Sequence, residues 1–153
     1  MPHRLLLQVG MMVLAAALAV GCGRVQTYSF QTGAPPDRLP ELAYDEVRKG
    51  SYVDHHDLLG PVQVELSARE IAEFPMILAQ GRCYRAMAVA EDRRSEIRLA
   101  LLDEDFVERM ADEGKKGVAT LRVCPERTEN LLLNVDGVGS RLRVVVALVQ
   151  QPE

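Results

Sequence analysis

The chain has 153 residues and a mass of 17.0 kDa, enough for one domain of ordinary size. Its composition is 48% hydrophobic and 26% charged with a mean hydropathy of -0.03, which excludes a disordered tail, a multispanning membrane protein and a collagen-like repeat. With 18 basic against 22 acidic residues, the chain lacks the basic surface that nucleic-acid binding needs. The composition therefore predicts a globular body, with no nucleic acid among its partners.

The N-terminal segment has the form of an export signal. A short basic start ending at Arg4 is followed by an apolar run, which Gln8 and Gly10 interrupt and which ends in small residues before Cys22. This interrupted run is not typical of a spanning helix, which needs about 20 apolar residues. The last four residues of the segment, Ala19-Val20-Gly21-Cys22, resemble the lipobox of bacterial lipoproteins.

The lipobox resemblance implies that residues 1–21 are a signal peptide and that Cys22 becomes the mature N-terminus. In that family the cysteine thiol receives a diacylglyceryl group and the new amine is often acylated, for example with palmitate. Two or three acyl chains anchor a protein stably where one does not. Because Gly23 and Arg24 stand where inner-membrane lipoproteins usually have Asp, the resemblance implies the periplasmic face of the outer membrane. An ordinary secretory signal, with Cys22 left as a thiol, is the alternative.

The mature chain divides into a stem and a domain. Residues 22–60 are rich in Gly and Pro and are expected to be the lipidated N-terminus and stem, within which Val25, Tyr28 and Phe30 predict a short strand and residues 40–48 a helical turn. Residues 61–153 are expected to form the folded domain.

The sequence pattern of the domain predicts an all-β fold. Val62, Val64 and Leu66 alternate with polar residues, as in a strand with one buried face. Further strands are predicted over residues 97–101, 118–124, 131–135 and 141–149. Short strands with turn residues every eight to twelve positions favour an antiparallel β-sandwich.

Two stretches conflict with this pattern. Ser67 with Glu70 has the form of a capping box, which predicts a helical turn from Ala68 to Glu73. Residues 103–114 carry Phe106, Val107 and Met110 at helical spacing, but a hairpin is equally compatible with them.

The three cysteines have two expected roles, with one lipidated and the other two joined in a disulfide. If Cys22 is lipidated, Cys83 and Cys124 remain, each in a predicted strand and both in an oxidising compartment, which predicts a disulfide between them. Closing a loop of this length stabilises a fold by roughly 4 kcal/mol.

Four segments together resemble a known family. Residues 78–85, 97–103, 123–125 and 131–135 are similar to the bacterial pre-peptidase C-terminal type of domain, whose cysteine-bearing members have a Gly-x-Cys-Tyr strand and a later Cys-Pro. The resemblance implies a jelly-roll-like sandwich and a non-catalytic module. The family often has an Asp-Leu-Asp-Leu strand where this chain has Ser95-Glu96-Ile97-Arg98, with one carboxylate and an added cation, and this departure argues against the calcium binding known for some relatives.

The sequence contains weak candidates for chemistry. Asp54, His55, His56 and Asp57 could bind a divalent ion, but neighbouring residues of an extended chain point to opposite sides, so a solvated loop is the preferred interpretation. No Gly-x-Ser-x-Gly elbow is present. No cofactor is expected.

Paired charges give no stronger signal for an enzyme. The carboxylate pairs Asp103 with Asp105 and Glu91 with Asp92 lie in predicted turns, where solvated surface explains them. The basic pairs 93–94 and 115–116 also lie in turns, where solubilising charge explains them.

The sequence therefore predicts an outer-membrane lipoprotein acting as a binding or assembly module of the cell envelope, with a protein or polymer partner. Docking on a protein complex predicts an exposed sheet edge or apolar patch, whereas holding a polymer or peptide predicts a groove with polar groups. The alternative function is a small metal-dependent hydrolase using His55 and His56.

Overall fold

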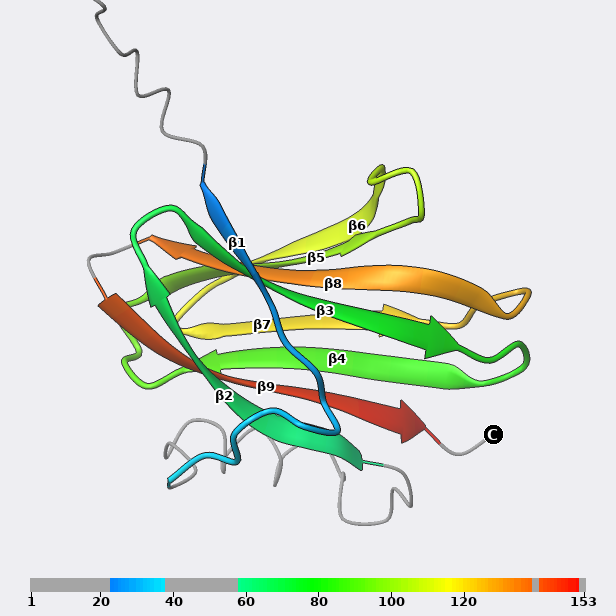
Figure 1. The fold of residues 1–153 in the computed structure, drawn as a ribbon, viewed down its shortest axis with the longest axis horizontal. Coiled ribbons are helices and arrows are strands. Elements are labelled where there is room, and N and C mark those ends of the chain that lie inside the picture. The colour runs from blue at the N-terminus through cyan, green and yellow to red at the C-terminus, as the bar shows by residue number, and fades with distance from the viewer. Residues whose placement is uncertain (1–22, 38–57, 139–140, 152–153) are drawn as a thin grey trace, which may run out of the picture.

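A computed structural model describes residues 23–37, 58–138 and 141–151 of the chain. Nine β-strands make up most of this described part, which contains no helix (Figure 1). The strands are β1 (Arg24–Thr27), β2 (Leu58–Ser67), β3 (Glu70–Leu78), β4 (Cys83–Ala90), β5 (Glu96–Leu102), β6 (Glu108–Gly114), β7 (Val118–Val123), β8 (Glu129–Val138) and β9 (Arg141–Gln151).

The strands form two sheets packed face to face. The five-stranded sheet has the order β1-β3-β8-β5-β6, and the four-stranded sheet has the order β2-β9-β4-β7. All neighbouring pairs are antiparallel except β1 and β3, which run parallel. The all-β sandwich predicted from the sequence is confirmed, with a single parallel pair added at its edge.

The period-two patterns of the sequence become the inner faces of the sheets. Val62, Val64 and Leu66 of β2 are each at most 2% exposed, while Gln63 and Glu65 between them are partly exposed. The apolar run of β9 has a different origin, because its residues from 144 to 149 are buried on both faces of an inner strand. Alternation therefore identifies half-buried strands, and a continuous apolar run identifies a strand covered on both sides.

The core between the sheets is made of aliphatic side chains around one aromatic group. Phe74 is fully buried and stacks on Phe30 at 4.7 Å and on Tyr28 at 5.6 Å between ring centroids. No polar or charged residue in the described part of the chain is fully buried. Hydrophobic burial, at about 25 cal/mol for each Å² of apolar surface, therefore supplies most of the stabilisation.

Residues 24–34 connect the two sheets along the side of the sandwich where β3 and β2 lie. β1 adds to the five-stranded sheet, Phe30 is buried in the core, and the Gln63 N–H of β2 donates to the Ala34 C=O at 3.0 Å. The short strand predicted around Val25 exists, and residues 24–34 contact both sheets. The packed body therefore begins well before residue 61, whereas the helical turn expected at residues 40–48 lies outside the described residues.

The helical turn predicted from Ala68 to Glu73 is wrong. Residues 68 and 69 form a tight turn that carries the chain from β2 in one sheet to β3 in the other, with Arg69 at a φ of 67°. The Ser67 N–H donates to Glu70 Oε2 at 2.8 Å, which is the return bond of a capping box. One of the two bonds of a capping box is therefore present, but it closes a turn between strands.

Residues 103–114 form a hairpin and not a helix. A loop over residues 103–107 leads into β6, which pairs with β5. Phe106 and Val107 are 68% and 57% exposed, so their helical spacing with Met110 does not correspond to a buried face.

The topology gives the sandwich two distinct ends. β3 and β5 both run from the end where β1 begins, which we call the proximal end, to the end that we call the distal end. The turns at residues 68–69, 91–95 and 115–117 lie at the proximal end. The loops at residues 79–82, 103–107 and 124–128 lie at the distal end (Figure 1).

Candidate functional site

Several of the candidate site residues predicted from the sequence lie outside the described part of the chain. These are the lipidation candidate Cys22 and the four metal-ligand candidates Asp54, His55, His56 and Asp57. Among the residues that are described, no group of three or more His, Cys, Asp or Glu side chains is arranged to hold a metal ion. No helix in the same residues is long and apolar enough to cross a membrane.

The predicted disulfide is present. Cys83 begins β4 and Cys124 directly follows β7, so the register of the two strands places them opposite each other, with their Cα atoms 4.1 Å apart. The bond ties the edge strand β7 to its neighbour at the distal end. Cys124 is exposed and Cys83 is partly exposed, so the bond lies at the surface beside the distal loops.

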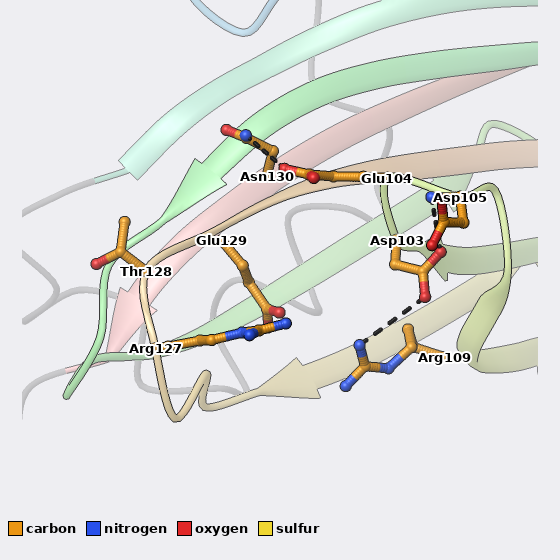
Figure 2. A pocket seen from close by; sticks show the side chains of 8 residues that line it. All are labelled: Asp103, Glu104, Asp105, Arg109, Arg127, Thr128, Glu129 and Asn130. Atoms are coloured by element: carbon orange, nitrogen blue, oxygen red, sulfur yellow. Dashed lines mark hydrogen bonds and ion pairs between the residues drawn. The ribbon is translucent and has the colours of Figure 1, made fainter.

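Charged side chains from two distal loops gather beside this bond. The loop between β5 and β6 and the loop between β7 and β8 line a cavity of about 430 Å³ (Figure 2). We call its lining the distal cluster, which consists of Asp103, Glu104, Asp105, Arg109, Arg127, Thr128, Glu129 and Asn130. The cluster joins residues far apart in the sequence because β5 and β8 are neighbours in the sheet.

Asp103 shapes the first of these loops. Its Oδ1 accepts the N–H groups of Asp105 at 3.1 Å and Val107 at 2.9 Å, and its Oδ2 lies 3.9 Å from Arg109 Nη1. Such Asx turns are a common use of an aspartate in a loop. The carboxylate pair Asp103 and Asp105 is therefore built into the loop, which agrees with the solvated-turn interpretation of the sequence.

The second loop is fixed by hydrogen bonds between loops. Asn130 Nδ2 donates to Glu104 Oε1 at 2.7 Å, a bond drawn in Figure 2, and the Gln80 N–H donates to Thr128 Oγ1 at 3.1 Å. The first bond links the loop at residues 103–107 to the start of β8, and the second links the loops at residues 79–82 and 124–128. The distal end is therefore a connected polar surface with four carboxylates and two guanidinium groups.

An exposed aromatic residue stands on the same loop. Phe106 has a φ of 60°, in a left-handed region that few residues other than glycine adopt, and it is 68% exposed. Keeping a phenylalanine there costs about 1 kcal/mol of backbone strain and leaves a large apolar side chain in water. An exposed phenylalanine in this conformation does not stabilise the fold. Exposed aromatic residues are frequent anchors in protein interfaces.

The other charge pairs named by the sequence lie at the proximal end. Asp92 Oδ1 accepts the Arg94 N–H at 3.0 Å, and Glu91 lies 3.9 Å from Arg143. The Gly117 N–H donates to the Ser95 C=O, which brings the two basic pairs, 93–94 and 115–116, to neighbouring turns. No pattern in the sequence indicates this pairing, and sequence reasoning missed Arg109, Arg127 and Asn130 because the distal cluster forms only through the sheet order.

Comparison with known proteins gives a likeness at the level of the fold. No known family model matches the chain, and no curated protein is significantly similar to it in sequence. Among solved structures, the chain is similar to PliG of Aeromonas hydrophila, a periplasmic inhibitor of g-type lysozyme. The TM-score is 0.52 at 9% sequence identity, over 84% of this chain and 98% of that one. The sandwich is thus a fold that also occurs in a periplasmic protein.

Proposed function

We propose that the chain is a lipoprotein of the outer membrane whose sandwich is a non-catalytic module that binds a protein partner in the periplasm. The observation that carries this proposal is the distal end, where the exposed and strained Phe106 stands beside the distal cluster, whose polar side chains come from two loops and the strand ends next to them. Apolar anchors surrounded by polar groups are the usual composition of a protein interface.

Three further features support the proposal. The lipobox resemblance ends at Cys22, directly before the described body. The disulfide fits an oxidising compartment. The fold is similar to that of a periplasmic inhibitor of another protein, g-type lysozyme.

A g-type lysozyme is the first partner to test, because the structural neighbour inhibits that enzyme. Equimolar addition of the full chain carrying Cys22→Ser should slow cell-wall lysis by g-type lysozyme if the likeness extends to function. If the lysozyme is unaffected, the proposal of a protein partner still stands, and it is then tested by crosslinking in intact cells.

The crosslinking experiment places a photoreactive amino acid at position 106. We expect one defined adduct, which a second substitution in the distal cluster, Arg127→Glu, reduces. The same probe at Val25, which is 53% exposed at the proximal end, is the matched control and should give no such adduct. Equal adducts at both positions would contradict a distal binding surface.

Two measurements test the rest of the proposal. Cys22→Ser should move the protein from the membrane fraction to the soluble periplasmic fraction, and retention in the membrane would refute lipid anchoring. Elemental analysis of the purified chain tests the alternative hydrolase that would use His55 and His56. One retained divalent ion per chain, lost on replacing both histidines, would contradict a non-catalytic module.

A further inference from the structure

The edge of β3 is paired along only half of its length. β1 pairs with β3 from Glu70 to Glu73, and the Tyr28 N–H then donates to the Glu73 C=O at 2.7 Å. In a parallel ladder the next bond would run from the N–H of residue 75 to the Tyr28 C=O. Residue 75 is proline and has no N–H, so the ladder ends there.

After Tyr28, the chain turns away from β3. The Gly33 N–H donates to the Ser29 C=O, and the chain continues to β2 in the other sheet. Backbone groups along a strand point alternately to its two neighbours, so residues 73, 75 and 77 point away from β8. Within the described residues, the Pro75 C=O and both backbone groups of Ile77 therefore face an open edge.

A groove lies directly beside this edge. Its volume is about 730 Å³, and its walls include Phe30, Pro75, Ile77 and Leu132, with Glu104 and Asn130 at one side. Ile77 is 71% exposed, although it belongs to a regular strand of the sheet. An open strand edge with an exposed β-branched residue is a hazard that proteins usually cover or block.

We infer that the free edge of β3 and its groove bind an extended segment of the partner protein by β-strand addition. This inference rests on the proposed function and names its binding site. The Ile77 N–H donates to the added strand, and the C=O groups of Pro75 and Ile77 accept from it. Side chains on one face of that strand contact Ile77 and Leu132, as in other cases of strand addition.

Charge indicates the composition of the added segment. Glu104, the one charged residue that lines the groove, is held there by the bond from Asn130 Nδ2. In the adjoining distal cluster, four carboxylates outnumber the guanidinium groups of Arg109 and Arg127. A segment that alternates apolar residues with lysine or arginine therefore fits the groove. A second copy of this chain fits less well, because Pro75 has no N–H and leaves Ile77 as the one residue with both backbone groups available for reciprocal pairing.

The test uses the full chain carrying Cys22→Ser and a displayed library of random seven-residue peptides. We expect the selected peptides to alternate apolar and basic residues. Backbone N-methylation of the selected peptide at alternate residues keeps its side chains but removes its N–H donors. In one of the two N-methyl registers, we expect the affinity to fall by at least about tenfold, equivalent to about 1.4 kcal/mol.

Two matched variants locate the site. Ile77→Asp and Val138→Asp replace residues that are 71% and 72% exposed on the same face of the five-stranded sheet, at its distal and proximal ends. Ile77→Asp should weaken peptide binding at least about tenfold, whereas Val138→Asp should not. The amide of Ile77 should gain protection from hydrogen exchange when the peptide binds.

Three outcomes would overturn the inference. The first is an absence of selected peptides, and the second is binding that both N-methyl registers and Ile77→Asp leave unchanged. The third is a dimer of the chain that Ile77→Asp dissociates, which would assign the edge to a second copy. If the adduct at position 106 persists in Ile77→Asp, the proposed function survives although strand addition fails.

Discussion

At the scale of single residues, the bond between Cys83 and Cys124 contributes most directly to stability. It closes a loop with a sequence separation of 41 and joins an edge strand to its neighbour. Replacing both cysteines by alanine should lower the free energy of unfolding by about 2–4 kcal/mol, because the unfolded chain gains the freedom of that loop. Guanidinium unfolding followed by circular dichroism measures the difference. The comparison is made in the Cys22→Ser background, and a loss below about 1 kcal/mol would contradict it.

Glu70 makes the turn between β2 and β3 sensitive to pH. The Ser67 N–H donates to its carboxylate, and this bond, more than the nearby Arg24, holds the pKa of Glu70 below its usual value of 4.5. A lowered pKa in the folded state means that the stabilisation is present above about pH 4.5 and is lost as the pH falls through the folded pKa. The thermal midpoint of Glu70→Gln should therefore fall less than that of the native chain on acidification.

Asp136 provides a control, because its pKa is shifted in the direction opposite to that of Glu70. Burial raises the pKa of its carboxyl, and Arg98, at 4.0 Å, only partly offsets this. The stabilisation from Asp136 is present when it is protonated and is lost as the pH rises through the raised pKa. Asp136→Asn should therefore gain stability relative to the native chain at neutral pH. A parallel response of the two variants to pH would refute both assignments.

Single residues could be predicted from the sequence where chemistry alone decides their role. The cysteine pair followed from the compartment and from the assignment of Cys22. Ser67 and Glu70 were correctly recognised as hydrogen-bonded, but the same bond serves a helix start and a strand turn, so the element could not be inferred. The helical spacing of Phe106 left residues 103–114 open between a helix and a hairpin, because spacing does not reveal that a side chain is exposed.

At the scale of elements, one side chain links the two sheets at the edge formed by β6 and β7. Asp112 of β6 accepts the Thr120 N–H of β7 at 2.8 Å. This bond uses a backbone donor on the free edge of β7 and so protects that edge from other strands. β6 and β7 belong to different sheets, so the bond closes one side of the sandwich.

Replacing Asp112 should therefore open this side of the sandwich. Asp112→Ala leaves the Thr120 N–H unpaired in a partly buried place, and we expect a loss of about 1–3 kcal/mol in the free energy of unfolding. Asp112→Asn keeps an acceptor oxygen and should retain most of that energy. Hydrogen exchange at the Thr120 amide should accelerate in the alanine variant alone. Equal exchange rates in both variants would show that the bond does not protect the edge.

The strands themselves could be predicted, but their partners could not. The alternation of β2 and β5 and the apolar run of β9 each follow from burial within one element. The parallel pairing of β1 with β3 depends on which edge is free after the other strands have paired. Pro75 is visible in the sequence, but its effect in ending the β1 ladder is apparent only once β1 is known to lie there. The distal cluster and the groove escape prediction for the same reason.

At the scale of the whole molecule, the place where the described body begins determines how a lipid anchor at Cys22 would orient the sandwich. Gly23 already lies against the turn between β2 and β3, where an added Cβ would be 2.7 Å from the Arg69 carbonyl oxygen. Lipidation at Cys22 would therefore attach the acyl chains one residue from the packed body. The expected stem does not separate this anchor from the sandwich, because residues 24–34 are packed on both sheets.

An anchor at this place should hold the proximal end at the membrane. That end also carries Arg69, Arg93, Arg94, Lys115 and Lys116 in its turns, partly offset by acidic neighbours. Basic residues near an anionic surface contribute about 1 kcal/mol each. The distal cluster and the free edge of β3 would then face the periplasm, at a distance set by a nine-residue strand of roughly 30 Å.

This orientation can be measured with the lipidated chain in vesicles that contain a headgroup nitroxide lipid. A fluorophore on Ala68→Cys reports the start of β3, and one on Gln80→Cys reports the loop beyond its end, while the native disulfide leaves no other exposed thiol in the described residues. We expect strong quenching at position 68 and little at position 80, because nitroxide quenching requires close approach. The same two probes in Cys22→Ser should be quenched at neither position. Equal quenching of both probes in the lipidated chain would show that the sandwich lies flat on the membrane or turns freely about its anchor, and the distal end would then be no more available to a periplasmic partner than the proximal one.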